Sequence, residues 1–166
     1  MGSVQGSAIV YGSAMISGNA VVEANAYVME SATVTDHARI AGSGQVFGNA
    51  VVADRAQIIE SGRAYANARV HGRATIRGNA NIYGHSHIYG TATVSGNALI
   101  ASPGQAHVYG QAVVTGNATV YGHSHVCGNA VISGNQRIYN ERVGCNGNEP
   151  EDDALPEENV ISTDVN

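Results

Sequence analysis

One six-residue unit, here called a hexad, recurs four times without a gap in residues 112–135, which read AVVTGN, ATVYGH, SHVCGN and AVISGN. Each hexad opens with a small residue, carries Val or Ile at its third position and ends on Gly followed by Asn or His. The pattern extends from Val4 to Ile100 and, after a slip of two residues, from Val108 to Ile138. Of its 23 hexads, 22 have Val or Ile at the third position, and Ala64 is the exception. This periodicity decides the fold.

Each hexad predicts a short strand followed by a tight corner. β-Branched residues favour strands, and Gly and Asn adopt the positive φ that a tight corner requires. A period of six matches neither 3.6 nor 3.5 residues per turn, which argues against helices. A strand this short buries its aliphatic side chain only when successive coils stack on one another. The sequence therefore predicts a β-solenoid in which the third residue of each hexad points inward.

The outward side chains indicate how many hexads form one coil. Aromatic residues directly after the inward position are separated by multiples of 18 once the slip is removed, and they are Tyr11, Phe47, Tyr65, Tyr83, Tyr121 and Tyr139. The segment Gly-His-Ser-His occurs at residues 84–87 and again at 122–125, two such periods plus the slip. Three hexads per coil make a triangular prism of nearly eight coils, about 35–40 Å long at a strand spacing of about 4.8 Å.

The repeat resembles the hexapeptide-repeat family, the left-handed parallel β-helix of trimeric acyltransferases. The match is an aliphatic residue with a small residue four positions later, and it covers residues 4–143. The density of Val-x-Gly-Asn-Ala segments is most similar to acyltransferase-type proteins of bacteria and phages. We therefore expect an all-β, single-stranded left-handed parallel β-helix over residues 1–145. The left-handedness of the β-helix is implied by the resemblance alone. The general preference of parallel crossovers would favour a right-handed one.

The charge of the chain is divided between two regions. Residues 1–145 contain eight Arg, no Lys and six acidic residues, whereas residues 146–166 contain seven acidic residues and no basic one. This distribution does not indicate a nucleic-acid partner. The composition of residues 146–166 predicts a disordered acidic tail. Because the tail also contains Leu155, Val160 and Ile161, we expect it to act as a cap over the last coil, whose strand edges are otherwise open.

The sequence also bears on the compartment. The longest apolar stretches are too short to span a membrane, and no secretory signal is recognisable at the start. Cys127 and Cys145 are too few for a disulfide scaffold and fit a reducing compartment. These features together predict a cytoplasmic protein with no membrane partner.

The aromatic residues form the first candidate site, because the 18-residue period places Tyr11, Phe47, Tyr65, Tyr83, Tyr121 and Tyr139 on one face. Three interpretations remain open. The rings stack on one another and stiffen the prism. Alternatively, they form an interface with further copies of the chain, and the resemblance then implies a homotrimer about a threefold axis. The third interpretation is a platform on which carbohydrate stacks.

Five histidines near the slip form the second candidate site. His87, His107 and His125 occupy the same outward position on successive coils, which makes them candidate ligands for a divalent metal such as zinc. His85 and His123 lie at one corner, on either side of the slip. The resemblance to acyltransferases implies that such a histidine is catalytic, as the general base that activates an acyl acceptor toward acetyl-CoA. The alternative for all five is a copied surface motif without chemistry.

Arg55 and Arg73 lie at one corner on adjacent coils and are candidate cofactor-binding residues for the phosphates of coenzyme A. The alternative is that they are solvated corner residues or partners of the acidic tail. The acyltransferase family carries a long loop on its coils, whereas the insertion here has two residues. Our leading hypothesis is therefore a rigid, self-associating scaffold or binding module without catalysis. A coenzyme A-dependent acyltransferase with a histidine cleft between subunits and an unidentified acceptor is the second, and a histidine-based metal site is the third.

Overall fold

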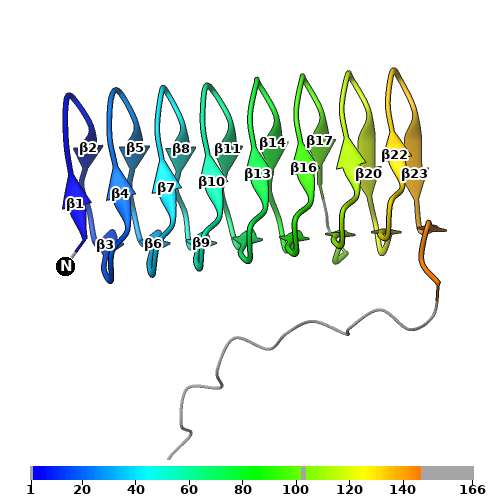
Figure 1. Cartoon of the computed structure of the whole chain (residues 1–166), viewed down its shortest axis with the longest axis horizontal. Coiled ribbons are helices and arrows are strands. Elements are labelled where there is room, and N and C mark those ends of the chain that lie inside the picture. Colours follow the sequence, from blue (N-terminus) through cyan, green and yellow to red (C-terminus); the bar gives the residue numbers. More distant parts are fainter. Residues whose placement is uncertain (1, 102–103, 147–166) are drawn as a thin grey trace, which may run out of the picture.

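The computed structural model describes residues 2–101 and 104–146, in which the chain forms 24 short strands and no helix. The strands make three parallel sheets of eight strands each, one on each side of a triangular prism (Figure 1). Successive strands along the chain belong to sheet A, sheet B and sheet C in turn. The all-β solenoid of three hexads per coil, predicted from the repeat, is therefore confirmed.

The strands have the following bounds. Sheet A contains β1 (Ser3–Val4), β4 (Val21–Val22), β7 (Arg39–Ile40), β10 (Gln57–Ile58), β13 (Thr75–Ile76), β16 (Thr93–Val94), β19 (Val113–Val114) and β22 (Val131–Ile132). Sheet B contains β2 (Ile9–Val10), β5 (Tyr27–Val28), β8 (Gln45–Val46), β11 (Arg63–Ala64), β14 (Asn81–Ile82), β17 (Leu99–Ile100), β20 (Thr119–Tyr121) and β23 (Arg137–Tyr139). Sheet C contains β3 (Met15–Ile16), β6 (Thr33–Val34), β9 (Val51–Val52), β12 (Arg69–Val70), β15 (His87–Ile88), β18 (His107–Val108), β21 (His125–Val126) and β24 (Arg142–Val143).

Strand pairing keeps the register that the hexads predict. Val4 pairs with Val22, one 18-residue coil further along the chain. Across the insertion between β17 and β18 the offset is 20 residues, so that Ile88 in β15 pairs with Val108 in β18. The last coil is one residue shorter than the 18-residue period, so Val126 pairs with Val143. Extra and missing residues are thus absorbed at corners, and the strands stay aligned.

The path of the chain gives the hand of the solenoid. In Figure 1 the chain rises along sheet A in front and descends along sheet B behind, while the coils advance from left to right. This path is a left-handed helix, as the resemblance to the hexapeptide-repeat family implied.

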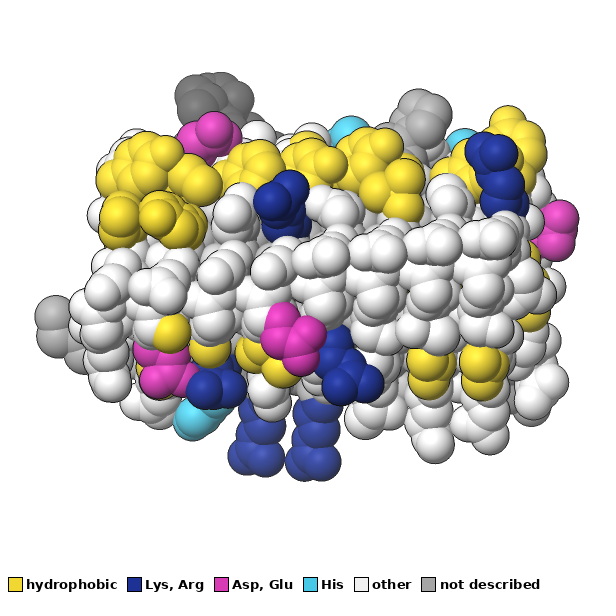
Figure 2. Space-filling model, turned by 90° about the horizontal axis from the view of Figure 1, so that it is seen from above, with side chains coloured by type: hydrophobic (Ala, Val, Ile, Leu, Met, Phe, Trp, Pro, Cys, Tyr) yellow, Lys and Arg dark blue, Asp and Glu magenta, His cyan; other side chains and the backbone are white. Residues whose placement is uncertain are grey.

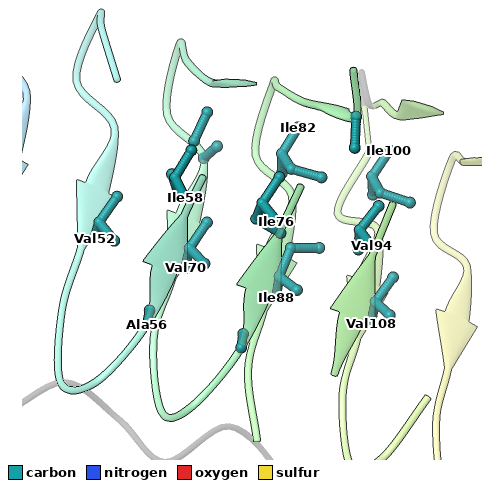
Figure 3. Close-up of a cluster of buried hydrophobic side chains, with 14 of the residues drawn as sticks. Val52, Ala56, Ile58, Val70, Ile76, Ile82, Ile88, Val94, Ile100 and Val108 are labelled. Atoms are coloured by element: carbon teal, nitrogen blue, oxygen red, sulfur yellow. The ribbon is translucent and has the colours of Figure 1, made fainter. Parts of the chain in front are cut away.

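The inward aliphatic side chains form the core. Figure 3 shows Ile58, Ile76 and Val94 of sheet A lined up along the prism, with the inward residues of the other two sheets beside them. All three are fully buried, and burying a side chain of this size contributes about 1.5–3 kcal/mol. Ala56 and the equivalent alanines of the middle coils are also fully buried, whereas Ala8, Ala14 and Ala130 near the two ends are partly buried. Ala64 remains in the core, so the one exception in the repeat shortens a side chain without breaking the column.

The corners explain why Gly-Asn recurs. Gly116 has a φ of +72°, and a Cβ there would lie 2.8 Å from the backbone nitrogen of Gly134 in the next coil. Side chains at the following position form a ladder, in which Asn117 donates from Nδ2 to Oδ1 of Asn135 at 3.1 Å. Glycine therefore permits the close approach of the coils, and asparagine ties them together at the surface.

Acidic residues replace glycine at several corners and satisfy the backbone of the next coil. Asp54 has a φ of 58°, and its Oδ2 accepts a hydrogen bond from the backbone nitrogen of Gly72 at 2.8 Å. Glu60, with a φ of 59°, accepts in the same way from Gly78 at 2.8 Å. These carboxylates stabilise corners, which accounts for their positions without a catalytic role.

The two ends of the described prism differ. In the first described coil the inward residue Val4 is 49% exposed, because it lies at the end of the described prism. In the last coil Cys127 and Cys145 form a disulfide, with their Cα atoms 5.1 Å apart. Composition favoured reduced cysteines, whereas the structure pairs them because the residues that follow β21 and β24 lie side by side on neighbouring coils.

The predicted tail or cap at residues 146–166 lies, from residue 147 onward, outside the described residues. In the part of the chain that is described, no helix has the length and apolar character needed to cross a lipid bilayer.

Candidate functional site

An aromatic row runs along the outer face of sheet B. It comprises the residues that directly follow the inward position on this sheet, which are Tyr11, Phe47, Tyr65, Tyr83, Tyr121 and Tyr139. Figure 2 shows hydrophobic side chains spread along one long edge of the prism, with basic side chains among them, and further basic side chains on the opposite edge. The row is therefore an apolar strip on the outer face of sheet B.

Within the row the rings stack on one another. The centroids of Phe47 and Tyr65 are 4.7 Å apart with the planes inclined by 4°, and those of Tyr65 and Tyr83 are 5.1 Å apart and inclined by 11°. Tyr121 and Tyr139 stack at 4.7 Å. These distances are close to the spacing of neighbouring strands, so the backbone itself sets the stacking. Burial and the neighbouring Tyr83 raise the pKa of Tyr65 above its ordinary value of 10.0.

Met29 and Ala101 take the place of aromatic residues in the row, and the break at Ala101 separates Tyr83 from Tyr121. Beyond the break, the guanidinium of Arg137 lies 5.6 Å from the centroid of the Tyr121 ring, a cation–π distance. Tyr11 and Tyr139, at the two ends, are 54% and 53% exposed. The central rings are thus held in place by stacking, and the outer rings stand in solvent.

The three histidines of sheet C form a column on its outer face. The rings of His87 and His107 are 5.0 Å apart and inclined by 56°, whereas those of His107 and His125 are 4.8 Å apart and nearly parallel. A zinc site needs its nitrogen ligands to converge at about 2.0–2.1 Å from one ion. Among the described residues, no three His, Cys, Asp or Glu side chains are grouped so that they could hold a metal ion.

A second column of rings lies beside the histidines, and sequence reasoning missed it. His71, Tyr89 and Tyr109 stack with centroids 5.2 Å and 4.8 Å apart, and the two tyrosines are only 8% and 5% exposed. Tyr89 also meets the ring of His107 edge-on at 6.3 Å. The signal was present in the sequence, because Tyr89 and Tyr109 are one coil apart once the slip is counted.

His125 has a distinctive environment in this column. Its Nδ1 is buried and has no hydrogen-bond partner among the described residues. Burial first, and then the cationic Arg142 and the neighbouring His123, lower the pKa of His125 below its ordinary value of 6.5. Folding therefore shifts the protonation equilibrium of His125 toward the neutral imidazole.

His85 and His123, the candidate catalytic residues, lie at the corner between sheets B and C and are exposed. Nδ2 of Asn67 lies 3.3 Å from Nε2 of His85, which places this histidine at the end of an asparagine ladder. The backbone nitrogen of His123 donates to Oδ1 of Asn140 at 2.9 Å. Neither ring pairs with a carboxylate of the described residues, so no acidic group orients a general base there.

Arg55 and Arg73, the candidate cofactor-binding residues, lie at a different corner, between sheets C and A. They line a shallow depression together with Asp36, His37, Asp54 and Gly72. Sheet C separates them from His85 and His123. Within one chain, the structure therefore does not bring the candidate base and the candidate phosphate contacts together.

No family model, no curated protein and no solved structure matches this chain. The architecture alone therefore defines the class of protein, which is a parallel β-solenoid with three hexads in each coil.

Proposed function

We propose that this protein is a rigid scaffold that associates with further copies of itself, in a trimer, through the aromatic row of sheet B. The observation that carries the proposal is the run of stacked, half-buried rings on the outer face of sheet B, from Phe47 through Tyr65 to Tyr83. Aromatic residues are enriched in protein interfaces and provide much of their binding energy. A contiguous run of aromatic side chains, such as Phe47, Tyr65 and Tyr83, indicates a surface that binds a partner.

The order of the rings favours association. Immobilising a side chain in an interface costs roughly 0.5–1.5 kcal/mol. The stack restrains Tyr65 from both sides before any partner arrives, so less of this cost remains to be met on binding. Each side of a triangular prism also presents an extended face, which suits three copies packed around a common axis.

The test is the mass of the protein in solution. Light scattering should give three times the 17.1 kDa of the chain. Replacing two central rings in one variant, Tyr65→Ser with Tyr83→Ser, should give monomers with an unchanged circular dichroism spectrum. Ile59→Ser is the matched control, because it alters the same hexad position on sheet A. A wild-type monomer at every concentration, or a double variant that remains trimeric, would refute the proposal.

A coenzyme A-dependent acyltransferase is the second candidate. The observation in its favour is that His85 and His123 lie at one corner, on either side of the insertion. Because Arg55 and Arg73 lie at another corner, they would have to contact the phosphates from a neighbouring copy. Calorimetry with acetyl-CoA tests this candidate. Binding that is lost in both His85→Ala and His123→Ala supports the site, and no binding by the wild-type protein eliminates it.

A further inference from the structure

Beyond the aromatic row, sheet C carries a second distinct surface, the basic column. It consists of side chains at the same outward position on five consecutive coils, paired in register, which are Arg69, His87, His107, His125 and Arg142. No strand of sheet C contains Asp or Glu in the described residues. Coulomb attraction for an anionic partner is therefore not offset by acidic side chains on these strands.

The basic column lies next to aromatic surface. Tyr89 and Tyr109 stack beside it in nearly parallel planes, and Tyr109 meets the ring of His125 edge-on at 6.2 Å. This column of rings continues to Cys127, which is fully buried. The face thus combines the cationic Arg69 and Arg142 with an aromatic floor formed by Tyr89 and Tyr109, which suits a peptide that is both acidic and partly apolar.

One segment of the chain has this composition. Residues 147–166 contain seven acidic residues and no basic one, together with Leu155, Val160 and Ile161. The disulfide between Cys127 and Cys145 fixes the chain at the end of the aromatic floor, directly before this segment begins. Sequence, charge and attachment point all relate the segment to sheet C.

The segment is long enough to follow the whole basic column. Its 20 residues can span up to about 65 Å when extended. The four coil steps from β24 to β12 cover about 19 Å at the spacing of neighbouring strands. Attachment through a short linker also gives an effective concentration of the order of millimolar, so weak ion pairs suffice for binding.

We propose that the outer face of sheet C is the binding site for the acidic segment 147–166 of the same chain. The segment binds along the basic column with its carboxylates toward Arg69 and Arg142. Its apolar residues lie toward the aromatic floor. This surface is separate from the aromatic row. A failure of this proposal would therefore leave the proposed scaffold function unaffected.

Paramagnetic relaxation in the full-length protein tests the proposal. A spin label is attached at Asn159→Cys, while the native disulfide keeps Cys127 and Cys145 unreactive. The label should broaden the amide signals of β15, β18 and β21 on sheet C and leave the middle strands of sheet A unaffected. A label at Ser133→Cys, on sheet A of the last coil, is the control for broadening that does not depend on the segment.

Charge variants then separate specific binding from chance proximity. Arg69→Ser and Arg142→Ser should each weaken binding up to about fivefold, as expected for an exposed ion pair, and 0.5 M NaCl should abolish the broadening. Arg77→Ser, an exposed arginine on sheet A, should have no effect. Unchanged amide spectra elsewhere show that each variant remains folded.

Three results would overturn the proposal. Broadening confined to the last coil would mean that the segment caps the end of the prism. Broadening in isotope-labelled protein mixed with spin-labelled, isotope-free protein would mean that it binds another copy. No broadening of sheet C would mean that the segment does not bind this face.

Discussion

The close approach of the coils at their corners leads to a prediction about two glycines one coil apart. Gly116 and Gly134 lie at the same corner, between sheets A and B, and have φ values of +72° and +63°. An added Cβ at Gly116 would lie 2.8 Å from the backbone nitrogen of Gly134, whereas one at Gly134 would meet nothing within 4 Å. Alanine substitutions at the two sites therefore share the strain of positive φ but differ in the steric clash.

The expected costs follow from these two contributions. An L-residue in the left-handed region costs about 1–2 kcal/mol, and the restricted unfolded chain of alanine recovers about 0.4–1 kcal/mol. Gly134→Ala should therefore destabilise its corner by about 1 kcal/mol. Gly116→Ala adds the overpacking cost of about 1–3 kcal/mol, because the atoms in its way are backbone and do not rotate aside.

Native-state hydrogen exchange at the amide of Asn117 measures the difference locally. This amide donates to the carbonyl oxygen of Gly134 at 2.7 Å, across the contact that the new methyl group would push apart. In Gly116→Ala its exchange should be about 30-fold faster than in Gly134→Ala, which corresponds to about 2 kcal/mol. Equal exchange in the two variants would refute the reasoning and show that the coils separate at little cost.

Two further predictions concern the C-terminal coils. Cys145→Ser removes the disulfide, whose loop closure contributes about 3 kcal/mol of stability. Hydrogen exchange at the amide of Cys127 should therefore become about 100-fold faster. An unchanged exchange rate would mean that hydrogen bonding alone holds the last coil. Because burial, Arg142 and His123 lower the pKa of His125, the unfolded state binds a proton at higher pH than the folded state does. The stability that His125 contributes is complete above its ordinary pKa of 6.5 and is lost as the pH falls toward the lowered value. Urea midpoints at pH 8 and pH 5 should therefore differ less in His125→Gln than in the wild type, and an equal difference would contradict the assignment.

The repeat in the sequence predicts most of the architecture because one physical rule is applied 23 times. Each β-branched residue at the third position requires an interior, and stacking provides it. The 18-residue period likewise predicts that Tyr65 lies over Tyr83 and that His107 lies over His125, and the ring distances of 5.1 Å and 4.8 Å confirm both. Columns of this kind follow from register alone, so no knowledge of side-chain contacts is needed.

Other features depend on interactions that a period does not encode. The last strand, β24, follows Ile138 by five residues to Val143 and so falls outside a strict six-residue count. The role of Asp54 depends on a left-handed backbone that aims its carboxylate at the next coil, which composition does not reveal. The separation of 18 residues between Cys127 and Cys145 indicated that they lie on neighbouring coils, but the small number of cysteines favoured the reduced form.

The insertion between β17 and β18 has a practical consequence. Strands on either side of it keep their partners, as the pairing of Leu99 with Thr119 shows, so additional sequence at a corner does not disturb its neighbours. Peptides grafted at other corners should be displayed in the same way, each anchored to its own coil. Because the coils repeat every 4.8 Å or so, the separation between two such grafts could be chosen in fixed steps, and the molecule would serve as a ruler for presenting binding groups at defined distances.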